Sequence, residues 1–389
     1  MPGWELIGEA EKEELLKIFT ESDGVLFAHG FNDKRSNIFR VREFEKRVKE
    51  KLDIDYCLAC TSGTMAQYIA MKAMGIGPGD EVITQSFTFV ATVETILALG
   101  ATPVIVDIDE TYNMDYKELE KAITKNTKLI VPVHMLGNQC RMNEIMKIAR
   151  QYKIPVLEDA CEALGGELDG KMLGTIGDVG VFSLDFGKTI TTGEGGLIVT
   201  NDPALEKYSR EFHDHGHESN KKVPRGNDTR TIPGLNFRIS EMQGAVGLAQ
   251  IEKLDFIVQK NRKNKKKLKE GIIGQNKIKF RTIVDEDGDL ADTLIFALND
   301  KLLCQKFLKH YSELGYSTKN IPEAYDWHFA GKWNHMFTNV PRYKNTWQTE
   351  WKKSDDLLSR SISIPILVNS SDDYISKHID DINSIISTL

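Results

Sequence analysis

The sequence has few cysteines, no long apolar run and no excess of basic charge. Its 389 residues include 5 cysteines, and an odd number in a long chain fits reduced thiols better than a disulfide framework. No run of roughly 18 apolar residues appears, and the acidic N-terminal segment lacks the apolar stretch of a signal peptide. The formal charge of -7 argues against a general polyanion-binding surface. We therefore expect a cytoplasmic protein whose partners include neither nucleic acid nor a membrane.

Two short patterns resemble functional motifs but have simpler interpretations. Cys57 and Cys60 have the CxxC spacing of redox and zinc sites, yet no second pair exists and both lie in an apolar segment. Buried strand cysteines are the favoured interpretation. Gly75, Gly77 and Gly79 follow a helical pattern and precede a strand pattern, the reverse of a dinucleotide-binding turn. The sequence therefore lacks the glycine turn that a nicotinamide-dependent dehydrogenase needs.

What is present is the alternating pattern of an α/β protein. Strand-like runs recur at 56–60, 81–86, 102–107, 128–133, 155–159, 179–184 and 195–200, and apolar residues have helical spacing at 65–74, 90–99, 116–123 and 143–152. This alternation predicts parallel pairing through right-handed crossovers. The link between the last two runs is too short for a crossover helix, so we expect those two strands to be antiparallel. The prediction is a mostly parallel seven-stranded sheet with helices on both faces.

The chain is too long for one comfortable core, and its composition changes about two thirds of the way along. A polar stretch with glycine and proline, 214–234, interrupts the alternating pattern, and we interpret it as a functional loop or a partner-contacting arm. A helical segment, 240–254, follows it. A lysine-rich helix is expected at 261–271 and a last helix at 375–386. We predict a large domain, 1–255, and a smaller C-terminal α/β domain, 256–389.

The first pattern with chemical meaning is the turn Thr61-Ser62-Gly63-Thr64, which leaves the first strand and opens a helix. Such a turn presents free backbone N–H groups and the positive end of a helix dipole, which suits a phosphate group. The same residue types are also ordinary helix caps. A phosphate site and a simple cap both fit this turn when it is taken by itself.

The second pattern is Glu158-Asp159-Ala160, at the carboxyl end of the fifth strand, where open α/β sheets bind ligands. A buried carboxylate in this place is the counter-charge that a protonated pyridine ring requires, because an opposite charge raises the proton affinity of the ring nitrogen. An N-cap or a structural ion pair is the alternative interpretation.

The third pattern is the turn 182–188, Phe-Ser-Leu-Asp-Phe-Gly-Lys, followed by Thr-Thr-Gly-Glu-Gly-Gly at 191–196. Lys188 comes just after a strand end in a turn bounded by glycine, a position from which an amine can form an imine with an aldehyde. Desolvation there would lower the pKa of Lys188 and supply the free amine. The alternative is a solvated surface lysine.

Together these segments resemble the ordered motifs of the DegT/DnrJ sugar aminotransferases. The likeness rests on the three patterns above and on Asn236-Phe237-Arg238, and it extends to Ile364-Pro365. It implies the fold-type I aminotransferase architecture, pyridoxal 5'-phosphate as cofactor and a homodimer with active sites at the subunit interface. It also implies ping-pong transfer of an amino group from L-glutamate to a keto or aldehyde sugar.

The resemblance also implies individual roles. Lys188 would form the Schiff base and Asp159 would face the ring nitrogen, while the remaining cofactor contacts would be Gly63, Thr64 and Ser183 at the phosphate, Phe89 on the ring face and Asn236 from the neighbouring subunit. A core aromatic is the alternative interpretation of Phe89. Glu162 departs from the family pattern, because many relatives carry Gln or His beside the phenolic oxygen of the cofactor. A carboxylate there would repel a phenolate unless it is protonated or turned away.

For the substrate we name His134, Asp185, His215, Arg225 and Arg230 as contact residues. Planar guanidinium groups suit a carboxylate or a phosphate, and Arg238 is a further candidate for that role. The run Asp214-His-Gly-His-Glu218, which follows His213, resembles a metal site by composition, but such a loop can equally hydrogen-bond sugar hydroxyls. We expect no metal.

Most of the family aminates nucleotide-linked keto sugars, but a narrower resemblance points to another substrate. The segments Met1-Pro2-Gly3, 214–218, 224–230 and 326–330 resemble the branch that aminates the C8 aldehyde of a 3-deoxy-octulosonate. Its product, 8-amino-3,8-dideoxy-manno-octulosonate, is a lipopolysaccharide component whose carboxylate would meet Arg225 or Arg230. Two further alternatives are a dehydratase, in which relatives replace the lysine by histidine, and a cofactor-binding protein without turnover. Lys188 and Asp159 together favour the aminotransferase.

Overall fold

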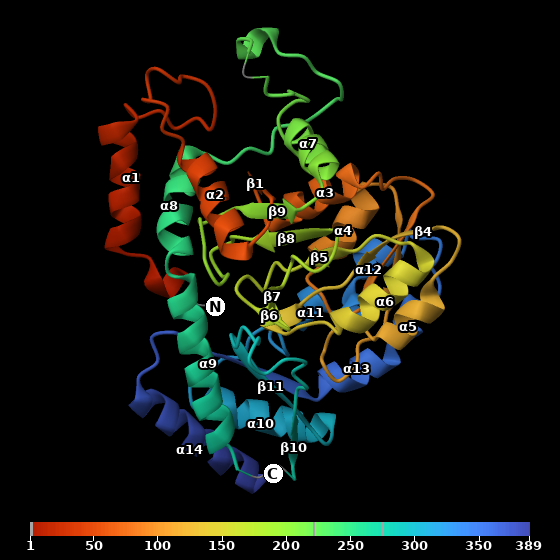
Figure 1. Ribbon diagram of the computed structural model, residues 1–389. Helices are drawn as coiled ribbons and strands as arrows, with labels where there is room; N and C mark the ends of the chain where they lie inside the picture. The colour runs from red at the N-terminus through yellow and green to blue at the C-terminus, as the bar shows by residue number, and fades with distance from the viewer. Residues whose placement is uncertain (1–2, 221, 274–275) are drawn as a thin grey trace.

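A β-sheet of seven strands forms the centre of the computed structural model, which describes residues 3–220, 222–273 and 276–389 (Figure 1). One half contains β1 (Tyr56–Cys60), β9 (Gly196–Thr200), β8 (Val179–Ser183) and β5 (Leu157–Asp159); the other contains β4 (Thr127–Val131), β2 (Glu81–Gln85) and β3 (Thr102–Val106). The halves join because Asp159 N donates to Pro132 O over 2.9 Å and His134 N donates to Asp159 O over 3.0 Å. The order across the sheet is therefore β1-β9-β8-β5-β4-β2-β3.

The directions of the strands confirm the predicted sheet. Strand β9 is antiparallel to both of its neighbours, β1 and β8, whereas β5 with β8 and β2 with β3 and β4 are parallel. Ser183 lies opposite Gly196 in the pairing of β8 with β9. The turn that carries Lys188 therefore connects these strands at the carboxyl end of β8, the same edge at which β5 ends.

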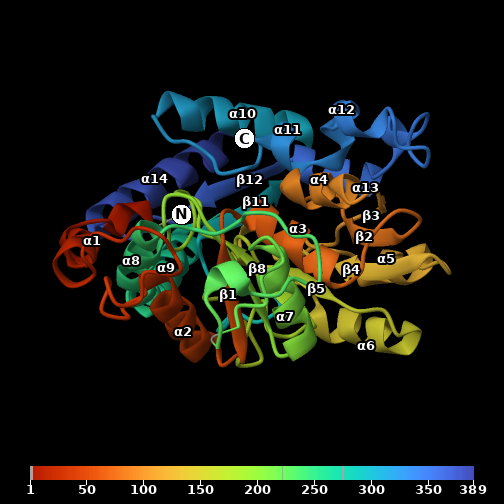
Figure 2. The same cartoon turned by 90° about the horizontal axis from the view of Figure 1, so that it is seen from above.

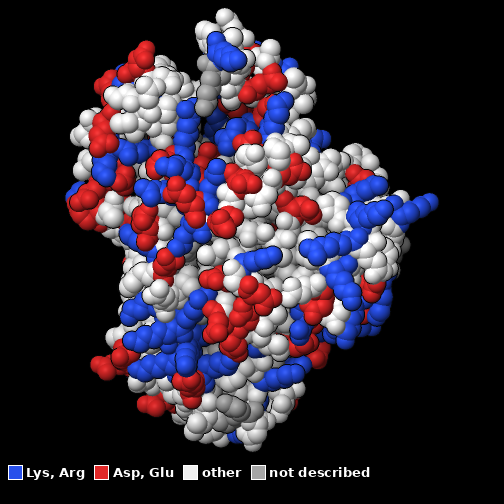
Figure 3. All heavy atoms as spheres, viewed as in Figure 1, with Lys and Arg blue, Asp and Glu red and all other residues white. Residues whose placement is uncertain are grey.

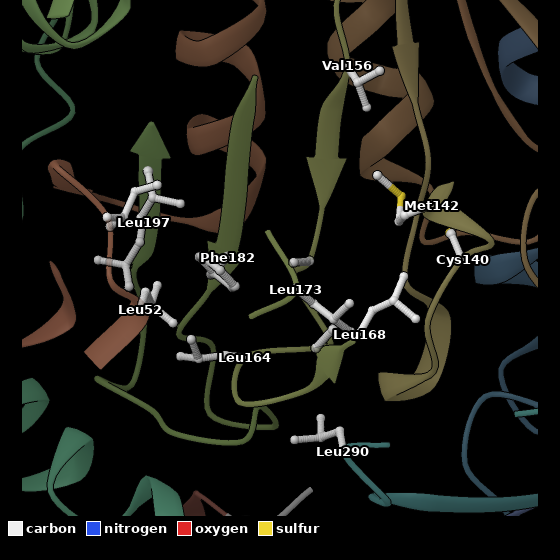
Figure 4. Packing of buried hydrophobic residues seen from close by; sticks show 14 of the residues in the cluster. Leu52, Cys140, Met142, Val156, Leu164, Leu168, Leu173, Phe182, Leu197 and Leu290 are labelled. Atoms are coloured by element: carbon white, nitrogen blue, oxygen red, sulfur yellow. The ribbon is translucent and has the colours of Figure 1, made fainter. Parts of the chain in front are cut away.

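Helices cover both faces of this sheet, as the alternation predicts. The first face is covered by α3 (Gly63–Ala73), α4 (Ala91–Ala98) and α7 (Pro203–Phe212); the second by α2 (Arg40–Leu52), α5 (Tyr116–Ala122), α6 (Met142–Tyr152) and α8 (Glu241–Ile251). In β1, Leu58 packs toward the first face and Cys57 toward the second. Figure 4 shows part of the hydrophobic cluster on the second face, including Phe182 and Leu197 from neighbouring strands. Burial on both faces explains the nearly continuous apolar runs of the strands.

The helix starts follow from capping residues. The Ser62 hydroxyl accepts a hydrogen bond from Met65 N over 3.1 Å at the start of α3. The Asp202 carboxylate accepts one from Ala204 N over 2.7 Å, and Pro203 occupies the first position of α7. Such caps pair backbone N–H groups that have no partner within the helix, and proline suits the first position because it lacks an N–H.

The C-terminal part contains an antiparallel sheet with its own core. Its strands are β10 (Ile278–Phe280), β11 (Thr293–Leu298) and β12 (Ser361–Pro365), and its helices are α9 (Leu254–Gly271), α10 (Lys301–Glu313) and α14 (Asp372–Thr388) (Figure 1). Helix α9 crosses the predicted boundary at residue 255 without a break. Leu254 and Ile257 belong to the core beneath the large sheet, whereas Leu268 belongs to the C-terminal core. The division into 1–255 and 256–389 stays a proposal.

One segment that follows the C-terminal strand β11 returns to the large sheet. It contains α11 (Tyr325–His328), α12 (Asn334–Phe337) and α13 (Lys352–Ser359), and its buried aromatic residues pack with Phe87 and Ile105. Figure 2 shows α11, α12 and α13 grouped beside α4. Thr88 N donates to His328 O over 2.9 Å, and Val90 N donates to Trp327 O over 3.0 Å. These bonds bring a distant segment to the carboxyl end of β2.

At the end of the molecule opposite the C-terminal sheet, an arm projects from the large sheet (Figure 1). It follows α7, contains η3 (Arg225–Asn227), and is drawn in green at the top of Figure 1, whereas α1 (Glu9–Glu21) lies at the left. Isolated bridges join Asp214 to Asn236 and His217 to Arg230 at its base. A small hairpin of β6 (Glu167–Leu168) and β7 (Lys171–Met172) lies elsewhere, between β5 and β8 in the chain.

Acidic and basic side chains are interspersed over the face of the molecule that Figure 3 shows. This distribution agrees with the small net charge of -7 for the whole chain. Within the described ranges, no helix has both the length and the apolar character that crossing a membrane requires.

Candidate active site

Residues that were predicted to bind the cofactor lie together at one edge of the large sheet. Asp159 ends β5, Ser183 ends β8, and Gly63 opens the helix that follows β1. Gly63 and Ser183 are in close approach: a Cβ atom added to Gly63 would lie 2.8 Å from Ser183 Cβ and 3.0 Å from Cys161 Sγ. The carboxyl edge of a parallel sheet is where α/β proteins bind ligands, and glycine is required here because the helix start lies against the end of β8.

Asp159 is a buried carboxylate without a cationic partner among the described residues. Its Oδ2 accepts hydrogen bonds from Gln67 Nε2 and Thr92 Oγ1, both over 2.8 Å, and its Oδ1 accepts one from Cys161 N over 3.2 Å. Burial raises the pKa of Asp159, against the lowering effect of Thr92, Cys161 and Lys188. A buried carboxylate fixed by neutral donors gains free energy when a positive charge is placed beside it. The site therefore fits a protonated pyridine nitrogen.

Lys188 lies in the turn after β8 and faces a second carboxylate. Its Nζ is 3.3 Å from Glu162 Oε1, and its backbone N–H donates to Asp185 O over 2.9 Å. Burial alone would lower the pKa of Lys188, but the negative charges of Glu162 and its neighbours outweigh burial and raise it. The predicted lowering of this pKa is therefore wrong for the chain alone, because the pairing of Glu162 with the lysine was not predicted.

Glu162 is buried among groups from distant parts of the chain. Its Oε2 accepts a hydrogen bond from Leu136 N over 3.0 Å, and Asn320 Nδ2 lies 3.4 Å from its Oε1. Burial would raise the pKa of Glu162, but the positive charges of Lys188 and Lys319 hold it well below its usual range. The lowered pKa favours the ionised form of Glu162, and its carboxylate is directed to Lys188.

The predicted phosphate residues form a consistent cradle. Gly63 and Thr64 occupy the first turn of α3, where backbone N–H groups and the helix dipole favour an anion. The Ser62 hydroxyl already accepts a hydrogen bond from the start of this helix, so it is less available to a ligand than the backbone N–H groups. The Ser183 hydroxyl lies across from Gly63 and accepts a hydrogen bond from Asp185 N over 3.3 Å. These residues fit the phosphate of a cofactor whose ring reaches Asp159.

An aromatic wall borders this edge. Phe89 is 42% exposed and stacks on Trp327, with ring centroids 6.4 Å apart and an interplanar angle of 17°. The ring centroid of His328 lies 5.4 Å from that of Phe89. Burial lowers the pKa of His328, although the charge of Glu162 opposes this effect. Phe89 is therefore not a core aromatic, and its exposed ring is free to stack on a ligand.

His134 does not belong to this group, and its predicted role at the substrate is corrected. Its side chain is 0% exposed, its Nδ1 accepts a hydrogen bond from Cys140 N over 3.1 Å, and its Nε2 lies 2.9 Å from Glu158 Oε2. Both ring nitrogens are therefore engaged within the protein. Glu158 and Asp159 are consecutive strand residues and point to opposite faces of the sheet, which separates His134 from Lys188. Asp185, in contrast, lies beside the lysine.

The arm holds the remaining predicted residues. Arg225 Nη2 lies 2.5 Å from Asp214 Oδ1, and Arg238 pairs with the same oxygen. Burial would raise the pKa of Asp214, but the two guanidinium groups lower it to about 2. His215, Arg230 and Asn236 are exposed. Across residues 3–220, 222–273 and 276–389, no recorded contact joins these arm residues to Lys188.

The histidines around this arm have separate partners. His213 is buried, and its Nδ1 pairs with Arg210 O over 2.5 Å. His217 Nδ1 lies 3.5 Å from Asp228 Oδ2. In the described part of the chain, no group of three or more His, Cys, Asp or Glu residues is arranged to hold a metal ion. Met1 and Pro2 of the narrower resemblance lie outside the described residues, and of that motif only Gly3 is described, with its N–H donating to Lys188 O over 3.0 Å.

Several residues of this site were not predicted from the sequence. Gln67 and Thr92 hold Asp159, and Lys319 and Asn320 surround Glu162. His328 is part of a segment that the resemblance included, but it received no role. None of these residues carries a local signal, because each is polar in a sequence context that suits a helix or a loop equally well.

Comparison with known proteins gives the same picture. The sequence profile of the DegT/DnrJ/EryC1/StrS aminotransferase family matches residues 33–383. The GDP-perosamine synthase of Caulobacter vibrioides is 44% identical over 214 residues, which are 55% of this chain and 56% of that protein. The spore coat polysaccharide biosynthesis protein SpsC of Bacillus subtilis is 32% identical over 89% of this chain and 90% of its own length. The chain thus spans little more than half of the first relative.

A solved structure supports the fold and the cofactor. NtdA from Bacillus subtilis, crystallised with bound cofactor PMP, superposes with a TM-score of 0.83 at 25% identity, covering 99% of this chain and 84% of that one. The predicted fold-type I architecture is confirmed. Pyridoxal phosphate is the cofactor of this family, and the cradle at Gly63, the carboxylate of Asp159 and the amine of Lys188 fit it.

Proposed function

Because the chain belongs to the DegT/DnrJ/EryC1/StrS aminotransferase family, we propose that it transfers an amino group from L-glutamate to the carbonyl carbon of a keto or aldehyde sugar. The observation that carries this proposal is the placement of Lys188, Asp159 and Gly63 at one sheet edge. An amine, a buried carboxylate and a helix start are the three groups that engage the aldehyde, the ring nitrogen and the phosphate of pyridoxal phosphate.

When bound, pyridoxal phosphate supplies an aldehyde that exchanges between amines and a ring that withdraws electrons from the bonds around that carbon. Asp159 keeps the ring nitrogen protonated, and Thr92 and Gln67 keep the Asp159 carboxylate oriented. Lys188 Nζ removes the α-proton of the donor and returns a proton in the second half of the reaction. Phe89 covers one face of the ring, since it is exposed at the same edge.

The relatives support a nucleotide-linked sugar as the acceptor. One relative is named GDP-perosamine synthase, and another, from Pseudomonas aeruginosa, is named UDP-2-acetamido-2-deoxy-3-oxo-D-glucuronate aminotransferase. Both names describe sugars that carry a nucleotide. A nucleoside diphosphate sugar with a ketone on the ring is therefore the first substrate class to test.

The octulosonate aldehyde is the second candidate, and the arm supports it. Arg225 and Arg238 share the single carboxylate of Asp214, so the two guanidinium groups retain donors for another anion. A sugar acid with a free carboxylate would use them. In this case the aldehyde at C8 would approach Lys188, and the product would be 8-amino-3,8-dideoxy-manno-octulosonate.

We further propose a cytoplasmic homodimer with shared active sites. Large apolar side chains are exposed around α1, the following loop and the arm, among them Phe19 at 60%, Phe31 at 61% and Leu235 at 50%. Such apolar exposure is typical of a surface that another chain covers. Asn236 has no recorded contact with Lys188 in its own chain and would serve the neighbouring site. Mixing Lys188→Ala chains with Asn236→Ala chains tests this, because hybrid dimers with shared sites regain activity.

The reaction itself is tested with purified protein, pyridoxal phosphate and L-glutamate. The acceptors are GDP-linked and UDP-linked keto sugars and the octulosonate aldehyde, and the products are 2-oxoglutarate and a sugar whose mass shows replacement of oxygen by an amino group. Transfer to one acceptor that depends on Lys188 supports the proposal and selects the substrate class. Release of 2-oxoglutarate without any aminated sugar from this panel would reject both substrate candidates.

A further inference from the structure

The reactive lysine of this chain is paired with a carboxylate that belongs to a rigid network. Lys188 Nζ lies 3.3 Å from Glu162 Oε1, and the side chains are 17% and 7% exposed. Neither group is therefore fully screened by water, and their mutual attraction is stronger than that of a surface pair. The pair lies beside Asp159, which is three residues before Glu162 in the sequence.

Glu162 is fixed from two sides. Leu136 N donates to its Oε2 over 3.0 Å, and Asn320 Nδ2 lies 3.4 Å from its Oε1. The loop that presents Leu136 is held in turn by Arg281, whose Nη2 donates to Met135 O over 2.6 Å. These contacts leave the Glu162 carboxylate little freedom to rotate away from Lys188.

The charged groups around the pair come from several segments. Lys188, Lys319 and His328 face Glu162, whereas Glu162, Cys161 and Asp185 face Lys188. Lys319 Nζ also lies 2.5 Å from Asp292 Oδ2, so this lysine already forms an ion pair with another carboxylate. Glu162 is consequently the carboxylate that forms an ion pair with Lys188.

We propose that Glu162 is a positioning residue that directs the Lys188 amine along the sheet edge and stabilises its protonated form in the apoprotein and after it has taken up a proton. The inference rests on the proposed function, because it assigns a role in that same site. The proton stays on Lys188 Nζ and is not transferred to Glu162. In the proposed reaction, such a cation is the acid that returns a proton to the substrate carbon.

The charges agree with this geometry. The pKa of Lys188 is raised although burial alone would lower it, and the pKa of Glu162 is lowered although burial alone would raise it. Gln or His at position 162 could accept or donate a hydrogen bond, but a neutral side chain would not hold the lysine charged. The carboxylate is therefore the feature that distinguishes this chain from the family pattern described above.

The test measures the pKa of Lys188 in the apoprotein, by competitive acetylation at a series of pH values and mass spectrometry of the peptide that contains it. Wild type, Glu162→Gln and Asn320→Ala are compared. Without the carboxylate, burial dominates, so we expect the pKa of Lys188 in Glu162→Gln to fall by at least about one unit, which is about tenfold more free amine at pH 8. Asn320→Ala loosens Glu162 and is expected to give a smaller fall.

The matched control is Glu118→Gln, which removes an exposed carboxylate 2.9 Å from Lys121 Nζ and far from the site in the sequence. The pKa of Lys188 should not change in this variant. An unchanged or raised pKa of Lys188 in Glu162→Gln would overturn the inference. If Glu162→Gln does not fold, judged by circular dichroism, Asn320→Ala decides, and a Lys188 pKa equal to that of wild type overturns the inference.

The readout does not depend on turnover, so the two proposals can fail separately. If wild-type Lys188 does not form an adduct with pyridoxal phosphate, the proposed function fails whatever the acetylation shows. If the adduct forms but Glu162→Gln leaves the Lys188 pKa unchanged in the apoprotein, only the role of Glu162 fails.

Discussion

Thr92 Oγ1 donates a hydrogen bond to Asp159 Oδ2 over 2.8 Å. The donor lies on α4 and the acceptor ends β5, so the contact links a helix on one face of the sheet to the carboxylate proposed to face the cofactor ring. Gln67 Nε2, from α3, donates to the same oxygen over 2.8 Å. The orientation of Asp159 is therefore set by two helices and not by its own strand alone.

Thr92→Val should weaken cofactor binding. Valine keeps the shape of threonine but removes the donor, and a hydrogen bond to a charged group contributes about 1.5–3 kcal/mol, so the Kd for pyridoxal phosphate should rise about tenfold or more. Fluorescence titration of the apoprotein measures it. Thr84→Val is the matched control, because the buried Thr84 hydroxyl donates to Val131 O over 2.9 Å, away from Asp159. Equal Kd values for the two variants would contradict the proposed role of Asp159.

Gly63→Ala should damage the phosphate cradle. The added Cβ would lie 2.8 Å from Ser183 Cβ, so the start of α3 must move away from the end of β8. We expect the Kd for pyridoxal phosphate to rise.

Gly77→Ala is the control for the effect of alanine itself, because no heavy atom lies within 4 Å of a Cβ added there. Its cofactor affinity should equal that of wild type. Wild-type affinity in Gly63→Ala would show that phosphate binds elsewhere.

His134→Leu should change stability and leave substrate binding unaltered. The variant removes the partner of Glu158 Oε2 and the acceptor of Cys140 N, and buried polar groups left unpaired cost about 1–3 kcal/mol of unfolding free energy. Urea denaturation measures this loss, and steady-state kinetics measure KM for the sugar. A raised sugar KM at unchanged stability would restore the substrate role for His134 that the sequence analysis predicted.

Stability should fall as the pH falls from about 6.5 to 4, partly through His213. Burial lowers the pKa of His213 to about 4 from an ordinary value of 6.5. Between pH 6.5 and 4, His213 therefore binds a proton in the unfolded chain but not in the folded chain. The free energy of unfolding consequently falls as the pH is lowered through this range. The shift corresponds to about 3 kcal/mol. Urea midpoints over this pH range should depend less steeply on pH in His213→Gln than in wild type, and parallel curves would contradict the assignment.

The sequence was sufficient to predict the sheet and the position of the main site residues on it. Strand runs, a short link between the last two strands and the helical spacing between the others predicted the sheet and placed Lys188 and Asp159 at its carboxyl edge. These features depend on local periodicity and on which strands can be parallel, both of which a sequence displays.

The side-chain partners could not be predicted in the same way. Asn320 lies 158 residues from Glu162, and Thr92 lies 67 residues from Asp159. Such contacts depend on how segments that are far apart in the chain pack together, which no spacing in the sequence encodes. His134 is a further example, because its partner Glu158 lies 24 residues away and only the structure shows both ring nitrogens engaged within the protein.

The most direct test of the account is the absorbance spectrum of the purified protein with pyridoxal phosphate, before and after addition of L-glutamate, for wild type and Lys188→Ala. The account predicts a visible band in wild type that depends on Lys188 and that glutamate shifts toward the near ultraviolet. A protein without a lysine-dependent band, or with a band that glutamate leaves unchanged, would contradict the proposal that this chain takes an amino group from glutamate.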